Sequence, residues 1–246
     1  MDFITLLPLF SAILVFVLGM FVVSKNIKSK VNITFFLFCF AVTIWMFGTY
    51  MMFLNKDNHD TAIFWDRFVY LGVTFIPIFM YHLSTAITYD TKKITKYLLA
   101  IGYILSTIFF FTVFTPHFVN DLFIYKWGVH TKAQILHHLF LIYFFIYIVL
   151  YFVWLYRYYK KTASPIERQK IKYFFIAFFI LAAIGPLAYL PAYGIGIYPF
   201  AYVSGLIFAS ILAYAILRYR LMDIRIVARR IFFYIGAAIF TYAIYY

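Results

Sequence analysis

Hydrophobic residues occur in seven long runs separated by short polar segments. The runs are continuous, whereas the strands of a membrane barrel alternate apolar and polar residues with a period of two. Each run approaches the ~20 residues that an α-helix needs to cross a hydrocarbon core ~30 Å thick. The pattern therefore predicts an all-α, polytopic transmembrane helix bundle. Its predicted spans are Phe3–Ser24, Ile33–Leu54, Phe68–Tyr89, Tyr97–Thr115, Ile135–Tyr156, Tyr173–Leu190 and Tyr198–Leu217.

A further apolar segment occupies residues 231–246. At 1.5 Å per residue it reaches only about 24 Å, which is less than a full crossing. It is either an interfacial helix or part of an eighth span, and we favour the second. We therefore expect a seven-helix transmembrane domain at 1–217, a basic connector at 218–230, and a truncated apolar helix at 231–246.

Composition supports a lipid environment. The sequence is 66% hydrophobic and 12% charged, whereas soluble domains are about 25% charged because water must solvate their surfaces. The net charge of +13 does not indicate nucleic acid as a partner, because the basic residues sit in short clusters between apolar runs. Such clusters determine topology and contact anionic lipid head groups. The lipid bilayer is the partner that the sequence predicts.

The basic clusters also set an orientation. Cytoplasmic loops of membrane proteins carry an excess of Lys and Arg. Seventeen of the 21 basic residues follow the first, third, fifth and seventh runs, and four lie in the other connections. We therefore predict an external N-terminus and a cytoplasmic end after the seventh span. The four exceptions are Lys56, Arg67, Lys126 and Lys132.

Polar and helix-breaking residues in the third span are candidates for function, because burying a charge in hydrocarbon is costly. His82 is either part of a polar relay or a neutral histidine bonded to a neighbouring helix, and we favour the neutral histidine. Pro77 lacks a backbone N–H, so we expect it to kink the span and free a carbonyl. At the predicted external mouth of the span, Asp66 and Arg67 either bind a polar ligand or pair at the head groups beside Trp65, and we favour the pair.

Catalytic and metal-binding patterns are not found in the sequence. It has no phosphate-binding glycine loop, nucleophile elbow or HExxH pair. Four histidines, His117, His130, His137 and His138, fall near one predicted external loop, but the adjacent pair His137–His138 points about 100° apart on a helix and no cysteine is near. We therefore predict no catalytic site, no metal and no cofactor, and no enzyme activity for this chain.

The most specific local pattern is the run Tyr214–Ile224, which continues into a basic segment. Leu217, Leu221 and Ile224 share one helix face, while the arginines can reach phosphates or other charges. Such an element either carries a shift of the bundle into a cytoplasmic module or is an ordinary charged flank of a span. We assign signal relay to Pro77, His82, Arg218, Arg220, Asp223 and Arg225.

The sequence resembles the N-terminal seven-transmembrane sensor region of bacterial histidine kinases. The resemblance rests on Asn32 followed by the second span with Trp45, the segment Trp65–Gly72 with Pro77, and the run Tyr214–Arg230 after the glycine-rich turn Gly194–Gly196. It implies a receptor-like input domain of a two-component system that feeds a cytoplasmic kinase or, in some proteins, a diguanylate cyclase. Because kinase outputs work as dimers, it also implies a homodimer formed through the parent protein.

We therefore predict a membrane-embedded signal-input domain that responds to an unidentified stimulus. The resemblance implies a sensor domain at 1–217, a cytoplasmic basic connector at 218–230 and an apolar helix at 231–246 that leads towards an absent output region. It also implies the cytoplasmic membrane of a bacterial cell. A ligand site is expected at the external ends of the spans, formed by Trp65, Arg67, Tyr70, Tyr193 and Tyr198. The alternative is a small multi-pass transporter or channel. That alternative needs a polar path across the midplane, and the sequence offers little beyond His82 and scattered Ser and Thr.

Overall fold

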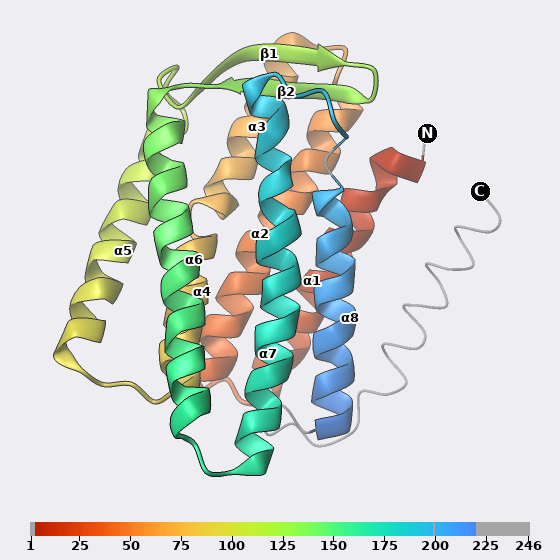
Figure 1. Cartoon of the computed structure of the whole chain (residues 1–246). Coiled ribbons are helices and arrows are strands. Elements are labelled where there is room, and N and C mark those ends of the chain that lie inside the picture. The colour runs from red at the N-terminus through yellow and green to blue at the C-terminus, as the bar shows by residue number, and fades with distance from the viewer. Residues whose placement is uncertain (1–2, 199, 220–246) are drawn as a thin grey trace.

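A bundle of long apolar helices is covered at one end by a two-stranded hairpin (Figure 1). This computed structural model describes residues 3–198 and 200–219. The first part of the bundle comprises α1 (Phe3–Lys25), α2 (Lys30–Leu54), α3 (His59–Val73), α4 (Ile76–Ile87) and α5 (Lys93–Thr112). The hairpin, β1 (Val119–Tyr125) and β2 (Gly128–Ala133), follows. The second part comprises α6 (Ile135–Lys161), α7 (Pro165–Ile184), the 3₁₀ helix η1 (Gly185–Tyr193) and α8 (Ala201–Tyr219).

Six helical segments of the described chain are long and apolar enough to cross a membrane. Two of them are composite, because α3 continues into α4 and α7 continues into η1. The apolar part of α8, Ala201–Ile216, is shorter. The chain is thus a multi-pass membrane protein with an all-helical membrane part. The predicted eighth span at 231–246 and most of the connector at 218–230 lie outside the described residues.

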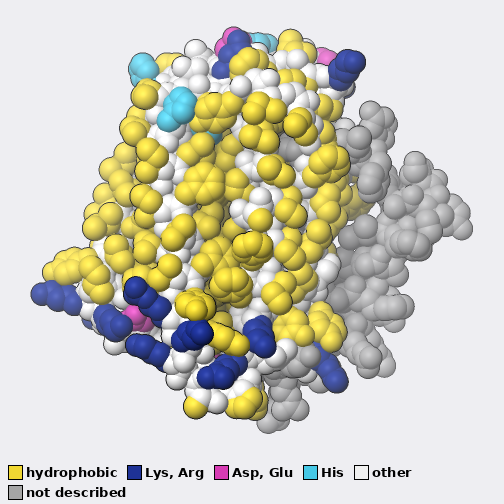
Figure 2. All heavy atoms as spheres, in the orientation of Figure 1, with side chains coloured by type: hydrophobic (Ala, Val, Ile, Leu, Met, Phe, Trp, Pro, Cys, Tyr) yellow, Lys and Arg dark blue, Asp and Glu magenta, His cyan; other side chains and the backbone are white. Residues whose placement is uncertain are grey.

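Charge is distributed unequally between the two ends of the bundle. Figure 2 shows Lys and Arg side chains gathered around the end opposite the hairpin, histidines at the hairpin end, and a broad hydrophobic surface between them. We call the first of these the basic end and the second the hairpin end. An apolar belt flanked by polar ends is the surface that a bilayer requires.

Helix boundaries follow the apolar runs closely where lysines border them. The predicted span Phe3–Ser24 corresponds to α1, and Ile33–Leu54 corresponds to α2, which begins three residues earlier at Lys30. Ser29 caps α2, since its hydroxyl accepts a hydrogen bond from the backbone N–H of Asn32 at 3.4 Å. The Asn32 side chain then donates to the carbonyl of Val22 at 3.1 Å and joins the start of α2 to α1.

Two helices begin well before the predicted spans. α3 starts at His59 rather than Phe68, with Asn58 as its cap, and α7 starts at Pro165 rather than Tyr173, with Ser164 as its cap. These first turns are polar, so they were missing from the apolar runs. Asp66 and Arg67, which we predicted at the external mouth of a span, therefore lie within α3 and not at its start.

The expected interruption at Pro77 is present. Proline cannot donate a backbone hydrogen bond, and its ring clashes with the carbonyl four residues earlier. That residue is Val73, the last residue of α3, and α4 starts at Ile76 with the proline in its first turn. The interruption spans Thr74 and Phe75.

A second interruption divides the sixth helical segment. The α-helix ends at Ile184, and residues Gly185–Tyr193 continue as η1. Gly194 ends η1 with φ of 83°, a left-handed conformation that glycine adopts without steric cost. The glycine-rich turn Gly194–Gly196 therefore begins directly after η1, and residues 191–193 are still helical.

The hairpin was not predicted. β1 and β2 are antiparallel, with Phe123 opposite His130 and an irregularity between Asn120 and Leu122. Asp121 lies at this bulge with φ of 57°. The segment contains too few apolar residues for a span and was treated as a loop.

Small residues allow close helix packing. Gly72 of α3 faces α2, where an added Cβ would clash with the carbonyl oxygen of Ala41 and lie 2.8 Å from Cβ of Ile44. Small residues at helix interfaces let backbones approach closely in lipid, where no hydrophobic force brings helices together. The α2–α3 contact therefore depends on the missing side chain at position 72.

Candidate functional site

Two neighbouring residues of α3 hold the base of the hairpin. The Asp66 carboxylate is buried and accepts hydrogen bonds from the backbone N–H of Thr131 at 3.0 Å and from the Thr131 hydroxyl. Nδ1 of His130 lies 3.4 Å from the same carboxylate oxygen. Asp66 therefore binds β2, whereas the sequence analysis favoured its pairing with Arg67.

Arg67 holds the other strand. One terminal nitrogen of its guanidinium donates to the carbonyl of Val119 at 3.3 Å, at the start of β1. Consecutive side chains of α3 thus bind both strands. Any displacement of the hairpin base must move α3 or break these bonds.

An exposed ion pair links the two strands further along. The Lys132 ammonium lies 2.5 Å from the Asp121 carboxylate and, with the backbone N–H of Leu122, holds the pKa of Asp121 down to about 2. A carboxyl group whose pKa is lower in the folded than in the unfolded protein stabilises the fold at any pH above its unfolded pKa. That stabilisation is lost as the pH falls through the folded pKa. Asp121 therefore stays ionised throughout the neutral range.

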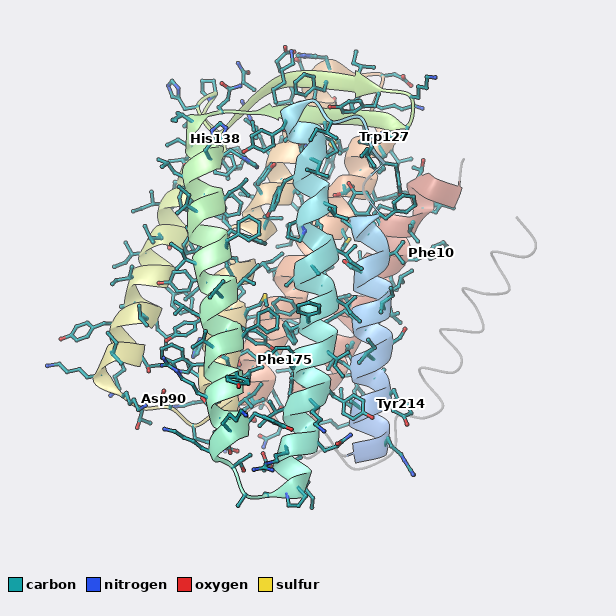
Figure 3. The ribbon with its side chains drawn as sticks, in the orientation of Figure 1. Phe10, Asp90, Trp127, His138, Phe175 and Tyr214 are labelled. Carbon is teal, nitrogen blue, oxygen red and sulfur yellow. The ribbon has the colours of Figure 1, made fainter. Side chains whose placement is uncertain are left out.

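The tip of the hairpin contacts the last turn of η1 and the connection between η1 and α8. The Tyr125 hydroxyl donates to the carbonyl of Pro191 at 2.7 Å, and the Trp127 indole N–H donates to the carbonyl of Gly196 at 3.0 Å. The rings of Tyr125 and Trp127 stack with centroids 5.0 Å apart. Figure 3 shows Trp127 at the end of the hairpin that lies above the start of α8. We call these two hydrogen bonds the tip contacts.

A buried histidine joins three helical elements beneath the hairpin. Nε2 of His137 lies 3.0 Å from the Tyr70 hydroxyl, and Nδ1 lies 3.0 Å from the Tyr193 hydroxyl. A neutral imidazole has one donor and one acceptor nitrogen, so it donates to one tyrosine and accepts from the other. The rings of Phe118 and Phe140 pack around it. This trio of His137, Tyr70 and Tyr193 connects α6, α3 and η1.

The predicted ligand residues are partly brought together. Tyr70 and Tyr193 meet at His137, and Tyr198 packs against Trp127 with ring centroids 5.7 Å apart. Arg67 binds the hairpin, as described above. Trp65 lies apart from this group, against the rings of Phe47, Phe64 and Phe68.

The predicted relay residues occupy separate places. Pro77 begins α4, and Nδ1 of His82 lies 2.7 Å from the Tyr103 hydroxyl of α5. This bond to a neighbouring helix matches the favoured interpretation of His82. Arg218 is exposed in the last turn of α8. Arg220, Asp223 and Arg225 lie outside the described residues.

A family model described as the N-terminal 7TM region of histidine kinase matches residues 7–225. The match includes every element that holds the hairpin. The chain belongs to this family. A search of curated proteins found no match. An N-terminal 7TM region of a histidine kinase is a non-catalytic input domain.

Within residues 3–198 and 200–219, no group of three or more His, Cys, Asp or Glu side chains could hold a metal ion.

This 7TM region has a small cavity where its two interrupted spans meet. The cavity is about 30 Å³, roughly one water molecule. Val73 and Ile76 line it from the two sides of the α3–α4 interruption, and Gly185 and Pro186 line it from the α7–η1 junction. The remaining lining residues are Trp45, Met80, Phe144, Ile148, Leu181, Ala182 and Tyr189. A wall of this composition does not form a polar path for a solute.

Several central residues of this 7TM region were missed or misassigned. His137 was considered only as a metal ligand, and Thr131, Tyr125 and Trp127 were not considered at all. The signal that was available is Gly128, a turn residue between two short segments rich in β-branched and aromatic residues. The partner of Asp66 is 65 residues away along the chain, and a single sequence carries no sign of that contact.

The trio predicts that an unpaired buried hydroxyl costs more stability than the loss of the hydrogen bond together with that hydroxyl. Replacing His137 with phenylalanine leaves the Tyr70 hydroxyl, 1% exposed, without a partner, and we expect a loss of about 2 kcal/mol of stability. Replacing Tyr70 with phenylalanine as well removes the orphaned group, so the double variant should regain about half of that loss. Thermal unfolding in one detergent measures both. A double variant less stable than the single one would contradict the assignment.

Proposed function

We propose that this chain is the signal-input region of a bacterial histidine kinase or a related signalling protein, with the hairpin as the element that responds to the stimulus. The observation that carries this proposal is the position of the hairpin. Its base is bound to α3 by Asp66 and Arg67, and its tip is bound to the end of η1 and to the η1–α8 connection. A stimulus that moves the hairpin therefore acts on both elements.

α8 is the output element in this proposal. It starts beside the tip contacts and ends at the basic end of the bundle. We propose that it forms the seventh crossing and that Arg218, together with Arg220, Asp223 and Arg225, passes its movement to a cytoplasmic module. A displacement of the hairpin would also move Tyr198, which packs against Trp127. It would reach Tyr70 and Tyr193 through their hydrogen bonds to His137. A stimulus shifts the bundle only by its different affinities for two packings.

The two interruptions support a bundle with more than one packing. Helix breaks are places where backbone geometry can change without disturbing a continuous hydrogen-bond ladder. Both breaks border one cavity, so either can shift into space that side chains leave empty. The homodimer expected of a kinase output would couple two such bundles.

The downstream coding sequence tests this function. We expect it to encode a kinase domain or another signalling output in frame after Tyr246. A stop codon directly after Tyr246 would remove the case for a signal-input region and favour the alternative, a small transporter or channel.

The orientation can be tested separately. Described Lys and Arg side chains gather at the basic end, so we propose that this end faces the cytoplasm and that the N-terminus and the hairpin lie outside. Alkaline phosphatase fused within residues 157–172 should then be inactive, while the same enzyme inserted at the hairpin turn, residues 126–127, should be active. The reverse pattern would overturn the proposed topology.

A further inference from the structure

The basic end contains a cavity that the signalling role does not use. Its volume is about 310 Å³, and it lies between the connection from α4 to α5 and the last turns of α6. Residues 88–92 line one side of it, and Trp154, Arg157, Tyr158 and Lys161 line the other. Figure 3 shows Asp90 at this end of the bundle, near the start of α5.

Three cations and one carboxylate border this cavity. Lys92, Arg157 and Lys161 are exposed at its rim. In the described part of the chain, none of the three forms an ion pair with a carboxylate. The Arg157 guanidinium lies 5.5 Å from the centre of the Trp154 ring, which holds it beside the cavity. The lining therefore carries an excess of positive charge.

The carboxylate of Asp90 already accepts two hydrogen bonds. The Trp154 indole N–H donates to it at 2.8 Å and the backbone N–H of Lys92 at 2.9 Å. Partial burial acts to raise the pKa of Asp90, but these hydrogen bonds outweigh it and hold the pKa below its usual value. Asp90 thus helps to fix the shape of the cavity, and its single negative charge offsets only part of the positive charge of the three cations.

The start of α5 adds positive potential at the same place. Lys92 is the residue before the helix, its side chain makes no capping hydrogen bond, and the first turn contains no acidic residue. The first turn contains Lys93 and Lys96 instead. Cations at a helix N-terminus oppose the helix dipole, and the free N–H groups there favour an anion.

Large apolar side chains are exposed along α5, the helix that begins directly after Lys92 of the cavity lining. Ile94, Tyr97, Ile101, Ile104 and Ile108 are each at least half exposed and recur on one side of the helix. A ligand with a phosphate at the cavity and acyl chains along this stripe would meet both surfaces. A soluble phosphate compound would use the cavity alone.

We propose that this cavity binds the phosphate head group of an anionic phospholipid, whose acyl chains lie along α5. Lys92, Arg157 and Lys161 contact the phosphate oxygens, and Trp154 packs against the glycerol region. The lipid then bridges α5 and α6 at the basic end. This inference does not depend on which end of the bundle faces the cytoplasm.

The test is a titration of the full chain, in uncharged detergent, with short-chain phosphatidylglycerol, and the bound lipid is measured by native mass spectrometry. Phosphatidylcholine of the same chain length and soluble glycerol phosphate are the comparison ligands. We expect phosphatidylglycerol to bind at least about tenfold more tightly than either, because each cation near an anionic head group contributes about a factor of five. Equal affinity for phosphatidylcholine would overturn the charge-based site.

Two triple variants separate this site from general charge. Replacing Lys92, Arg157 and Lys161 with glutamine should abolish the preference for phosphatidylglycerol. Replacing Lys25, Lys28 and Lys30 with glutamine removes the same charge from the connection between α1 and α2, outside the cavity lining, and should leave the preference intact. Circular dichroism checks that both variants fold; all six side chains are exposed.

Three results would contradict the proposal. The first is an unchanged preference in the Lys92, Arg157 and Lys161 variant, and the second is an equal loss in both variants. The third is binding of glycerol phosphate as tight as that of phosphatidylglycerol, which would assign the cavity to a soluble phosphate compound.

Discussion

Replacing Asp66 with alanine is expected to detach the base of the hairpin and to lower the free energy of unfolding by about 3 kcal/mol or more. The Asp66 carboxylate is 1% exposed and accepts two hydrogen bonds from Thr131. Removing it leaves a buried N–H and a buried hydroxyl without an acceptor, and each such group costs about 1–3 kcal/mol. This is one of the two largest effects that we expect in the molecule.

Asp60 of the same helix is the matched control. Its side chain is 98% exposed, and its partner is the exposed His59. Replacing Asp60 with alanine should cost less than about 1 kcal/mol, because exposed ion pairs contribute little. Equilibrium unfolding in mixed micelles measures both variants, and hydrogen exchange at the Thr131 amide reports the hairpin base directly. Similar losses for the two variants would show that the contact between Asp66 and Thr131 does not hold the hairpin.

Replacing Gly72 with alanine is expected to abolish most of the folded protein, whereas the same change at Gly185 is expected to be tolerated. An added Cβ at position 72 would clash with the carbonyl oxygen of Ala41 and crowd the Ile44 side chain. Because α2 presents backbone there, the two helices must separate, and overpacking of this kind costs about 1–3 kcal/mol or more.

Replacing Gly185 with alanine is the matched control, and we expect this variant to fold. Its added Cβ would meet the Trp45 ring at 3.5 Å, an ordinary contact, beside the small cavity. Both glycines have negative φ, so alanine adds no backbone strain at either position. Alanine also favours a helical conformation by about 1 kcal/mol over glycine. The yield of folded monomer on size exclusion in detergent and its thermal midpoint measure the pair. Equal stability of the two variants would contradict the close α2–α3 packing.

The membrane helices could be predicted from the sequence because each long run ends at charged or turn-forming residues. Lys25 ends α1, and Gly185 with Pro186 marks the α7–η1 junction. The interruption at Val73 follows from the chemistry of Pro77. The polar first turns of α3 and α7 could not be predicted from hydropathy. Hydropathy marks the apolar part of a helix that contacts lipid and does not mark the polar turns that extend the helix beyond it.

The candidate site was harder to predict because its bonds join distant parts of the chain. Asp66 and Thr131, or Trp127 and Gly196, are more than 60 residues apart. Tyr70 and Tyr193, both predicted for a ligand site, bind the same histidine, His137, which was not part of that prediction. Trp65 was grouped with them because it is adjacent to Asp66 in sequence, although its ring faces a different set of aromatic residues.

The central claim is that the tip of the hairpin controls the output through α8. On the proposed function, it is tested most directly in the full-length parent protein, by removing the two tip contacts while keeping an aromatic ring at both positions. The variant carries Tyr125→Phe and Trp127→Phe, and the control is Ile124→Ala, a hairpin side chain that is 83% exposed. Autophosphorylation in native membranes is the measurement. Two hydrogen bonds together contribute about 1–3 kcal/mol, so we predict a change of about tenfold in the double variant and none in the control. An unchanged rate in the double variant, at normal expression and fold, would contradict the account.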